Sequence, residues 1–131
     1  MATQTLLGDE TAGPEARAVF DDIRLKRNTD YVNNFWRALA HDPALLKAIW
    51  ERLQQAMAPG ALDPLVKEMI YIAVSATNGC SYCVHSHTAA ARAKGMTPAQ
   101  HAELLQVIAM ASQTNALANA LQVEVDERFK T

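Results

Sequence analysis

The sequence predicts an all-α protein, and three observations support this fold class. Helix start signals recur along the 131-residue chain, whereas no segment alternates β-branched and polar residues between hairpin dipeptides. Half of the residues are hydrophobic and a fifth are charged, with only 5 Gly and 5 Pro, which argues against disorder and low complexity. The length suits one compact domain over residues 1–131. We therefore expect a single bundle of about six to seven helices.

Three helix starts are marked by a capping residue followed by proline. Asp42-Pro43 and Asp63-Pro64 place a carboxylate before a proline whose missing N–H costs nothing at the first helical position. Thr97-Pro98-Ala99-Gln100 adds the reciprocal capping-box pattern to the same arrangement. These signals predict helices that begin at residues 43, 64 and 98.

Glycine-containing breaks supply the matching helix ends at Pro59-Gly60, Asn78-Gly79 and Gly95. With boundaries accurate to about two to four residues, the expected helices are 14–27, 31–41, 43–58, 64–78, 80–94, 98–108 and 112–128. The break before the last helix is the weakest of these signals. The polar run Gln113-Thr114-Asn115 also suits a kink within one longer helix.

Charge and hydropathy disfavour two classes of partner. The formal net charge is −2, and no Lys/Arg cluster is interleaved with aromatic residues, which disfavours nucleic-acid binding. The longest nearly apolar stretch, Met69 to Ala76, is far shorter than the roughly 18 to 20 residues that cross a bilayer. The amino terminus lacks the positive and apolar segments of a secretory signal, so we expect a cytoplasmic protein without a membrane partner.

The final helical segment carries more apolar surface than one core face needs. One stripe is marked by Leu117, Ala120, Leu121 and Val125, and it is widened by Ala116, Ala118 and Val123. We expect part of this surplus to contact another subunit, which predicts a homo-oligomer. The alternative is a central helix that is fully buried within one chain.

The most informative motif is the C-x-x-C formed by Cys80 and Cys83, the two cysteines of the chain. A single such pair in a cytosolic chain favours redox or metal chemistry over a stapling role. At about 100° per residue, Cys80, Cys83 and His87 project within about 60° on one helix face. Cys80 lies at a helix start, where free N–H groups favour a thiolate, and Cys83 has His87 one turn on to accept its proton. The spacing also permits a small disulfide, so one cysteine can capture a sulfenic acid formed on the other.

Glu68 stands alone in an otherwise apolar stretch of the preceding helix. Desolvation would raise its pKa toward the range of a proton relay serving His87 or a thiol. The alternative is an exposed carboxylate paired with Lys67 or another surface base. His85 projects away from the reactive face, so we expect it to point outward or to play a supporting part.

A structural zinc site is the non-enzymatic alternative. Cys80, Cys83, His85 and His87 form a compact set of ligand types, but His85 is directed away and no distant ligand pair is evident. We therefore expect no metal. We also expect no cofactor, because no G-x-G-x-x-G or other dinucleotide signature occurs and reducing equivalents must come from a partner.

Glu68, Cys80, Cys83 and His87 together match the pattern of a known family, the AhpD-like alkylhydroperoxidase and carboxymuconolactone decarboxylase superfamily, which this sequence resembles. The family surroundings K-E…N-G-C-x-Y-C…H…G are also present, and Phe35 to Pro43 resembles the preceding helical turn. The resemblance covers roughly residues 35–95. It implies an all-helical subunit that forms trimers or hexamers, with the thiol site at a helix start near a subunit interface.

The same resemblance implies reduction of a hydroperoxide through Cys80 and Cys83, with Glu68 and His87 as proton relay. A lipoyl-bearing or thioredoxin-like protein would be the dithiol donor. Tyr82 stands where the founding peroxidases carry a further relay histidine, and it either relays through its hydroxyl or simply packs. The decarboxylase branch generally lacks the cysteine pair, so the motif argues against that activity.

Two questions about the chemistry stay open at the level of the sequence. A general disulfide reductase or thiol-redox partner needs the same residues as a peroxidase but no peroxide site. Cys83 is the preferred attacking thiol because His87 lies one turn away, with Cys80 resolving the sulfenic acid. The opposite order remains open, since the helix start favours a Cys80 thiolate.

Overall fold

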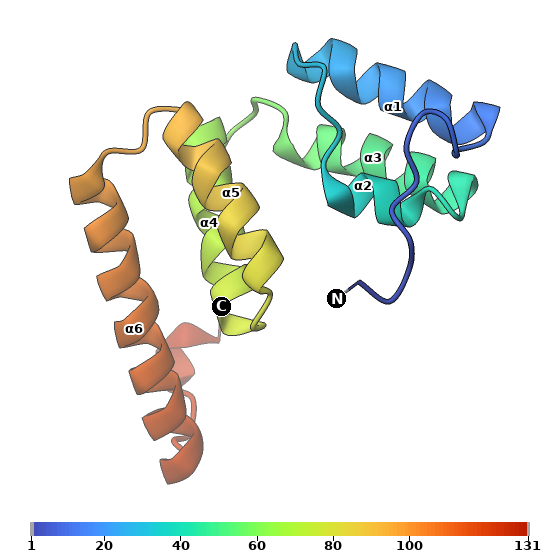
Figure 1. Ribbon diagram of the computed structural model, residues 1–131. Coiled ribbons are helices and arrows are strands. Elements are labelled where there is room, and N and C mark those ends of the chain that lie inside the picture. Colours follow the sequence, from blue (N-terminus) through green and yellow to red (C-terminus); the bar gives the residue numbers. More distant parts are fainter. Residues whose placement is uncertain (1, 131) are drawn as a thin grey trace. The chain divides into compact units, whose positions relative to one another are not determined.

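The computed structural model describes residues 2–130, and this range contains six α-helices, one short 3-10 helix and no strand (Figure 1). The helices are α1 (Pro14–Arg27), α2 (Asn34–Leu39), α3 (Pro43–Met57), α4 (Pro64–Thr77), α5 (Ser81–Ala93) and α6 (Pro98–Leu121), followed by η1 (Glu127–Phe129). The all-α class and the expected number of helices are confirmed. The chain forms two compact units, divided after Ala58, and each is described by itself.

Helices α1 to α3 form the first unit around an aromatic and aliphatic core. Phe20, Ile23 and Leu46 are fully buried, and Trp36 and Trp50 lie beside them. The two indole rings meet edge to face, with 5.3 Å between their centroids. The Trp50 Nε1–H donates to a carboxylate oxygen of Asp22 at 2.7 Å, so the core tryptophan keeps a polar partner at its rim.

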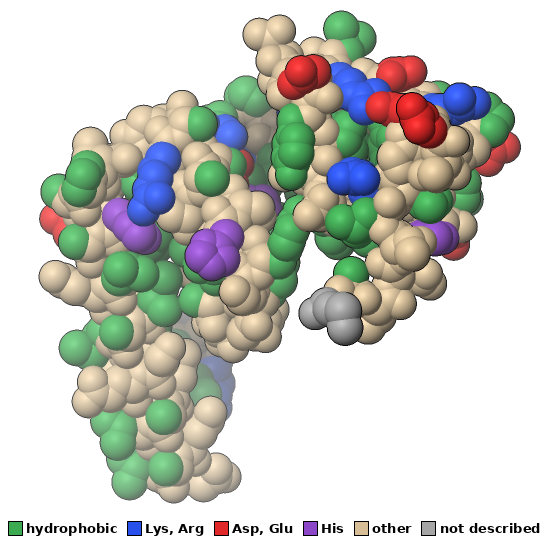
Figure 2. All heavy atoms as spheres, in the orientation of Figure 1, with side chains coloured by type: hydrophobic (Ala, Val, Ile, Leu, Met, Phe, Trp, Pro, Cys, Tyr) green, Lys and Arg blue, Asp and Glu red, His purple; other side chains and the backbone are tan. Residues whose placement is uncertain are grey.

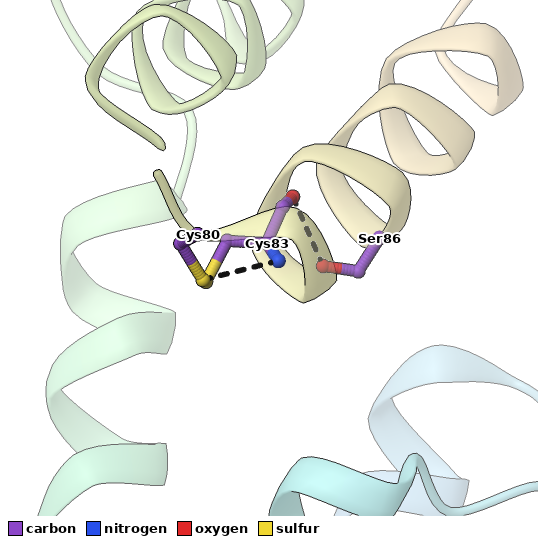
Figure 3. The surroundings of a disulfide bond; sticks show 3 residues. All are labelled: Cys80, Cys83 and Ser86. Carbon is purple, nitrogen blue, oxygen red and sulfur yellow. Dashed lines mark hydrogen bonds between the residues drawn. A yellow bond between two sulfur atoms is a disulfide. The ribbon is translucent and has the colours of Figure 1, made fainter. Parts of the chain in front are cut away.

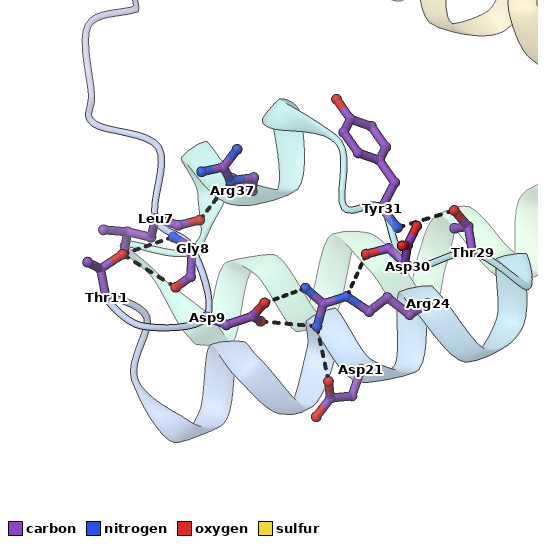
Figure 4. Close-up of polar contacts among 10 residues, drawn as sticks. All are labelled: Leu7, Gly8, Asp9, Thr11, Asp21, Arg24, Thr29, Asp30, Tyr31 and Arg37. Carbon is purple, nitrogen blue, oxygen red and sulfur yellow. Dashed lines mark hydrogen bonds and ion pairs between the residues drawn. The ribbon is translucent and has the colours of Figure 1, made fainter.

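The N-terminal segment is tied to this unit by two arginines (Figure 4). Arg24 on α1 contacts both carboxylate oxygens of Asp9, at 2.6 and 3.0 Å. Arg37 on α2 donates to the carbonyl of Leu7 at 3.0 Å. A bidentate guanidinium and a backbone contact therefore hold residues 7–9 against α1 and α2.

Helices α4 and α5 form a hairpin in the second unit and lie side by side (Figure 1). Ile72, Ala91 and Met96 are buried together, and Leu65, Met69, Leu104 and Ile108 pack around them. Glycines in the left-handed region bound α5 at both ends, Gly79 with φ 71° and Gly95 with φ 95°. These two turns fix where the helix that carries the C-x-x-C begins and ends.

The predicted break between helices 98–108 and 112–128 is wrong, because α6 runs without interruption from Pro98 to Leu121. Thr114 donates its hydroxyl back to the carbonyls of Met110 and Ala111, at 3.1 and 3.2 Å, so this polar side chain is satisfied inside the helix. The predicted extension to residue 128 is also wrong. Gln122 takes φ 50°, a left-handed conformation that ends the helix.

Helix α2 covers only Asn34–Leu39, so it is shorter than the predicted helix 31–41. The capping signals are confirmed more closely. Asp42 accepts from the Leu45 N–H at 3.1 Å, and Asp63 accepts from the Leu65 N–H at 2.8 Å. Thr97 forms the complete capping box at the start of α6.

No residue of α6 is buried. Leu104 and Ile108 are partly covered by the hairpin, whereas every residue from Ala109 to Leu121 is exposed. Along this helix Figure 2 shows mostly apolar and uncharged atoms. The alternative of complete burial within one chain therefore does not hold for α6. None of the helices formed by residues 2–130 has the length and apolar character of a membrane span.

Candidate functional site

The two cysteines lie at the start of α5 and are joined to each other (Figure 3). Cys80 is the N-cap residue of α5, one position before the first helical residue Ser81, and its sulfur bonds to that of Cys83 at 2.10 Å. The Cys83 N–H also donates to the Cys80 Sγ at 3.3 Å, so the sulfur takes the place of a capping oxygen. The bridge agrees with the disulfide that the spacing predicts.

Glu68 on α4 is buried, with 4% of its surface exposed, and its two partners come from α5 and from the C-cap residue that follows it. Its Oε2 lies 2.7 Å from His87 Nδ1, and its Oε1 accepts from Lys94 Nζ at 3.0 Å. The alternative of an exposed carboxylate paired with Lys67 or another surface base is wrong about exposure, because Glu68 is buried, although it does pair with a partly exposed base, Lys94. One carboxylate links two side chains that are seven residues apart in sequence.

The expected upward shift in the pKa of Glu68 is also wrong. Burial does raise this pKa, but the hydrogen bonds from His87 and Lys94, together with the positive charge of Lys94, hold the pKa of Glu68 below its usual value. The group is thus a carboxylate near neutral pH and can only accept hydrogen bonds. His87 must then carry its proton on Nδ1, which leaves Nε2 as the basic nitrogen of the neutral ring.

The orientation of His87 is fixed from a second side by Tyr71. The two rings stack, with 3.5 Å between their centroids and 18° between their planes. Only 18% of the His87 side chain is exposed. Within the described chain no hydrogen bond joins His87 to either sulfur of the disulfide. Helix α5 thus carries the disulfide in its first turn and the oriented imidazole one turn further on.

Sequence reasoning missed Lys94 and Tyr71. Helical spacing holds a signal for both, since Lys94 lies two turns after His87 and Tyr71 lies one turn after Glu68. Of the other residues considered, Tyr82 and His85 lie in the first turns of α5 and are exposed. Residues 2–130 contain no group of three or more His, Cys, Asp or Glu side chains placed to hold a metal ion.

Comparisons with known proteins agree on one family. The model of the carboxymuconolactone decarboxylase family matches residues 43–124. The crystal structure of the alkylhydroperoxidase AhpD core from Rhodospirillum rubrum is 63% identical, with a TM-score of 0.96 over 100% of this chain and 98% of that one.

Two curated relatives are both named alkyl hydroperoxide reductase AhpD. The one from Solibacter usitatus is 40% identical over 72 residues, which are 55% of this chain and 39% of that protein. The one from Maricaulis maris is 30% identical over 130 residues, covering 92% of this chain and 65% of that protein. The chain thus spans about 39% and 65% of the lengths of these two relatives.

Proposed function

Since this chain belongs to the carboxymuconolactone decarboxylase family, we propose that it acts there as a thiol-dependent hydroperoxide reductase of the AhpD-like type. The observation that carries the proposal is the shared position of two elements on α5. A redox-capable cysteine pair caps the helix, and one turn later an imidazole is oriented by a buried carboxylate. Peroxide reduction needs a thiolate, a resolving thiol and a proton carrier, and α5 holds all three types of group.

In the proposed reaction the reduced protein reacts through Cys83. Its thiol proton passes to Nε2 of His87, and the thiolate attacks one oxygen of the hydroperoxide. A sulfur–oxygen bond forms as the oxygen–oxygen bond breaks, and the alkoxide takes a proton to leave as the alcohol. Cys80 then attacks the sulfenic acid, the disulfide forms, and the hydroxyl leaves as water after protonation. Two thiols are oxidised and one peroxide is reduced to alcohol and water.

Glu68 acts in this scheme as a positioning residue. Its carboxylate holds the proton on Nδ1 of His87, so the opposite nitrogen stays available as a base. Tyr82 is the candidate for an additional hydroxyl relay, because it lies between the two cysteines in sequence and is exposed.

A protein dithiol reduces the disulfide again in this proposal. The class proposed is a lipoyl-bearing or thioredoxin-like protein acting in the cytoplasm. We also propose that the chain works as a trimer or hexamer, because α6 exposes Leu105, Met110, Leu117 and Leu121 in the single chain. A second copy of this chain is the occupant that we expect on α6.

Single-turnover reduction of a hydroperoxide by Cys80→Ser and Cys83→Ser proteins, with dimedone trapping of sulfenic acid, tests the roles. Cys80→Ser should react and be labelled at Cys83, whereas Cys83→Ser should react far more slowly. The specific competitor is the reverse order, since the Cys83 N–H would stabilise a Cys80 thiolate. A fast reaction of Cys83→Ser with label at Cys80 exchanges the roles. If the wild type reduces no hydroperoxide but reduces protein disulfides, the peroxidase proposal fails and a disulfide reductase replaces it.

A further inference from the structure

The geometry points to Lys94 as a positioning residue for this site: its ammonium holds Glu68 and keeps the Glu68–His87 pair in its proton-accepting form at lower pH. This inference rests on the proposed function, in which His87 receives a proton from a thiol. Lys94 touches neither sulfur in the described chain, so its influence must pass through Glu68.

The first argument is the division of the carboxylate between two partners. Oε1 of Glu68 accepts from Lys94 and Oε2 contacts His87, so the carboxylate is anchored at both oxygens. Two anchors prevent rotation about the last torsion of the side chain, a torsion that is otherwise soft. The oxygen that faces Nδ1 of His87 is therefore kept in line for a hydrogen bond.

The second argument is the gradient of exposure across the three side chains. The side chain of Glu68 is 6% exposed and that of His87 is 18% exposed, whereas the side chain of Lys94 is 40% exposed. The buried carboxylate thus receives its compensating charge from a cation that stays hydrated, which avoids the full cost of burying an ion pair. This placement lets Lys94 act on the pair while it remains open to substitution.

The third argument concerns where a proton can bind. Acidification adds one positive charge to the Glu68–His87 pair, on either member, and a neighbouring ammonium opposes that charge in both cases. Removing the ammonium therefore makes the pair easier to protonate, whichever group holds the proton. In a protein without this ammonium, the pair should therefore stop accepting the thiol proton at a higher pH than in the wild type.

Other ionisable groups lie on the elements around the pair. On α4, Tyr71 stacks its ring on His87, and Lys67 is the residue before Glu68. On α5, Cys83 lies one turn before His87 and is held in the disulfide. On α6, His101 and Glu103 are the ionisable residues, and in the described chain neither is hydrogen-bonded to Glu68 or His87.

The test compares Lys94→Gln, which removes the charge, with Lys94→Arg, which keeps it. Arg92→Gln is the matched control, because it removes an exposed cation from α5 two residues earlier. The rate of single-turnover peroxide reduction is measured against pH in each reduced protein. Lys94→Gln should move the acid limb to higher pH, with rates about three- to tenfold below wild type on that limb and a smaller loss on the plateau. Lys94→Arg should restore the wild-type midpoint, and Arg92→Gln should leave it unmoved.

A second measurement does not depend on activity. The imidazole resonance of His87, assigned by its loss in His87→Asn, is titrated by NMR in the disulfide form, where the cysteines do not titrate. Its midpoint should rise in Lys94→Gln and return in Lys94→Arg. A folded Lys94→Gln protein with an unmoved midpoint overturns the inference. If Lys94→Gln unfolds, Lys94→Met keeps most of the aliphatic stem and carries the same test.

The two proposals fail in distinguishable ways. If the NMR midpoint rises but no variant and no wild-type protein reduces a hydroperoxide, the proposed function fails while Lys94 still tunes the pair. If peroxide is reduced with a plateau that drops equally at every pH in Lys94→Gln, Lys94 has only a structural role and the inference is wrong.

Discussion

The two compact units differ in what they bury. The unit that ends at Ala58 buries large apolar side chains such as Phe20 and Leu46, and its ion pair between Arg24 and Asp9 is partly exposed. The unit that begins at Pro59 buries a smaller apolar cluster and also Glu68, the only charged residue among the buried ones in the described chain. Burying a charge costs stability unless the charge is paired. The second unit buries its charge at the place where the proposed thiol chemistry needs an oriented base.

Helices α1 and α6, one from each unit, also differ in how many residues they bury. Helix α1 buries Ala16, Val19, Phe20 and Ile23 on one face. Helix α6 is longer and buries no residue. Apolar residues on α1 therefore stabilise the single chain, whereas those on the second half of α6 are available for contact with another copy.

The largest expected difference between the units is in the rate of peroxide reduction after one carboxylate in each unit is replaced by its amide. Glu68→Gln should lower the single-turnover rate by about 10²- to 10⁴-fold, because a neutral amide does not stabilise the positive charge that His87 gains when it takes the thiol proton. Asp22→Asn should keep the rate within about twofold, since the amide oxygen still accepts from Trp50 and unit one contains no reactive group in this proposal. Stopped-flow kinetics with both variants checks this contrast. Equal rate losses would show that the chemistry is not confined to the second unit.

A smaller effect is expected from matched leucine truncations. Leu46→Ala should lower the free energy of unfolding by about 2 to 5 kcal/mol, because Leu46 is fully buried. Leu117→Ala should change the stability of the dissociated chain by at most about 0.5 kcal/mol, since Leu117 is 53% exposed. Denaturant titration at high dilution measures both changes.

The same Leu117→Ala variant should weaken self-association in sedimentation velocity, where the wild type should run as a trimer or hexamer at micromolar concentration. A wild type that sediments as a monomer removes the proposed role of α6. An unfolding cost for Leu117→Ala as large as that for Leu46→Ala at high dilution would show that α6 is covered within one chain.

The smallest expected effect is a pH dependence of stability. The pKa of Glu68 lies below its ordinary value of 4.5 in the folded protein. Its carboxylate therefore stabilises the fold above about pH 4.5, and this contribution is lost as the pH falls through the lowered folded value. Glu68→Gln should be about 1 to 3 kcal/mol less stable than wild type at pH 7, with a smaller difference at pH 3. The matched control is Glu51→Gln, which changes an exposed carboxylate in a long 3.9 Å pair with Lys47.

Urea unfolding of these two variants at both pH values provides the measurement. Glu51→Gln should stay close to wild type throughout, because exposed pairs of this kind contribute little. A difference for Glu68→Gln that grows on acidification would mean that Glu68 binds a proton more readily in the folded chain, contrary to the arrangement seen with His87 and Lys94.

The sequence was sufficient where local chemistry decides the outcome. The caps at Asp42, Asp63 and Thr97 satisfy their own helix ends, so the starts of α3, α4 and α6 were predictable. The cysteine bridge followed from the three-residue spacing. In contrast, Thr114 has two outcomes, a break or a bond back into the helix, and the sequence alone does not choose between them.

The direction of the pKa shift of Glu68 was harder to predict from the sequence. Its isolation in an apolar stretch indicates burial, and burial by itself raises the pKa of a carboxyl. The opposite direction depends on His87 and Lys94, which are 19 and 26 residues away in the chain and reach Glu68 because α4 and α5 form a hairpin. The family motif includes the carboxylate, the thiols and the imidazole, but not Lys94, the cation that pairs with the carboxylate.

The two glycines that bound α5 limit which substitutions its ends can accept. Gly79 and Gly95 hold left-handed backbone conformations, which cost about 1 to 2 kcal/mol for most other residues. A Cβ at either position would meet no neighbouring atom within 4 Å, so backbone conformation and not space is the constraint. Substitution of either glycine should therefore destabilise the turn that bounds α5 at that end. The segment that carries both cysteines and His87 thus depends on two positions that have no side chain to take part in the proposed reaction.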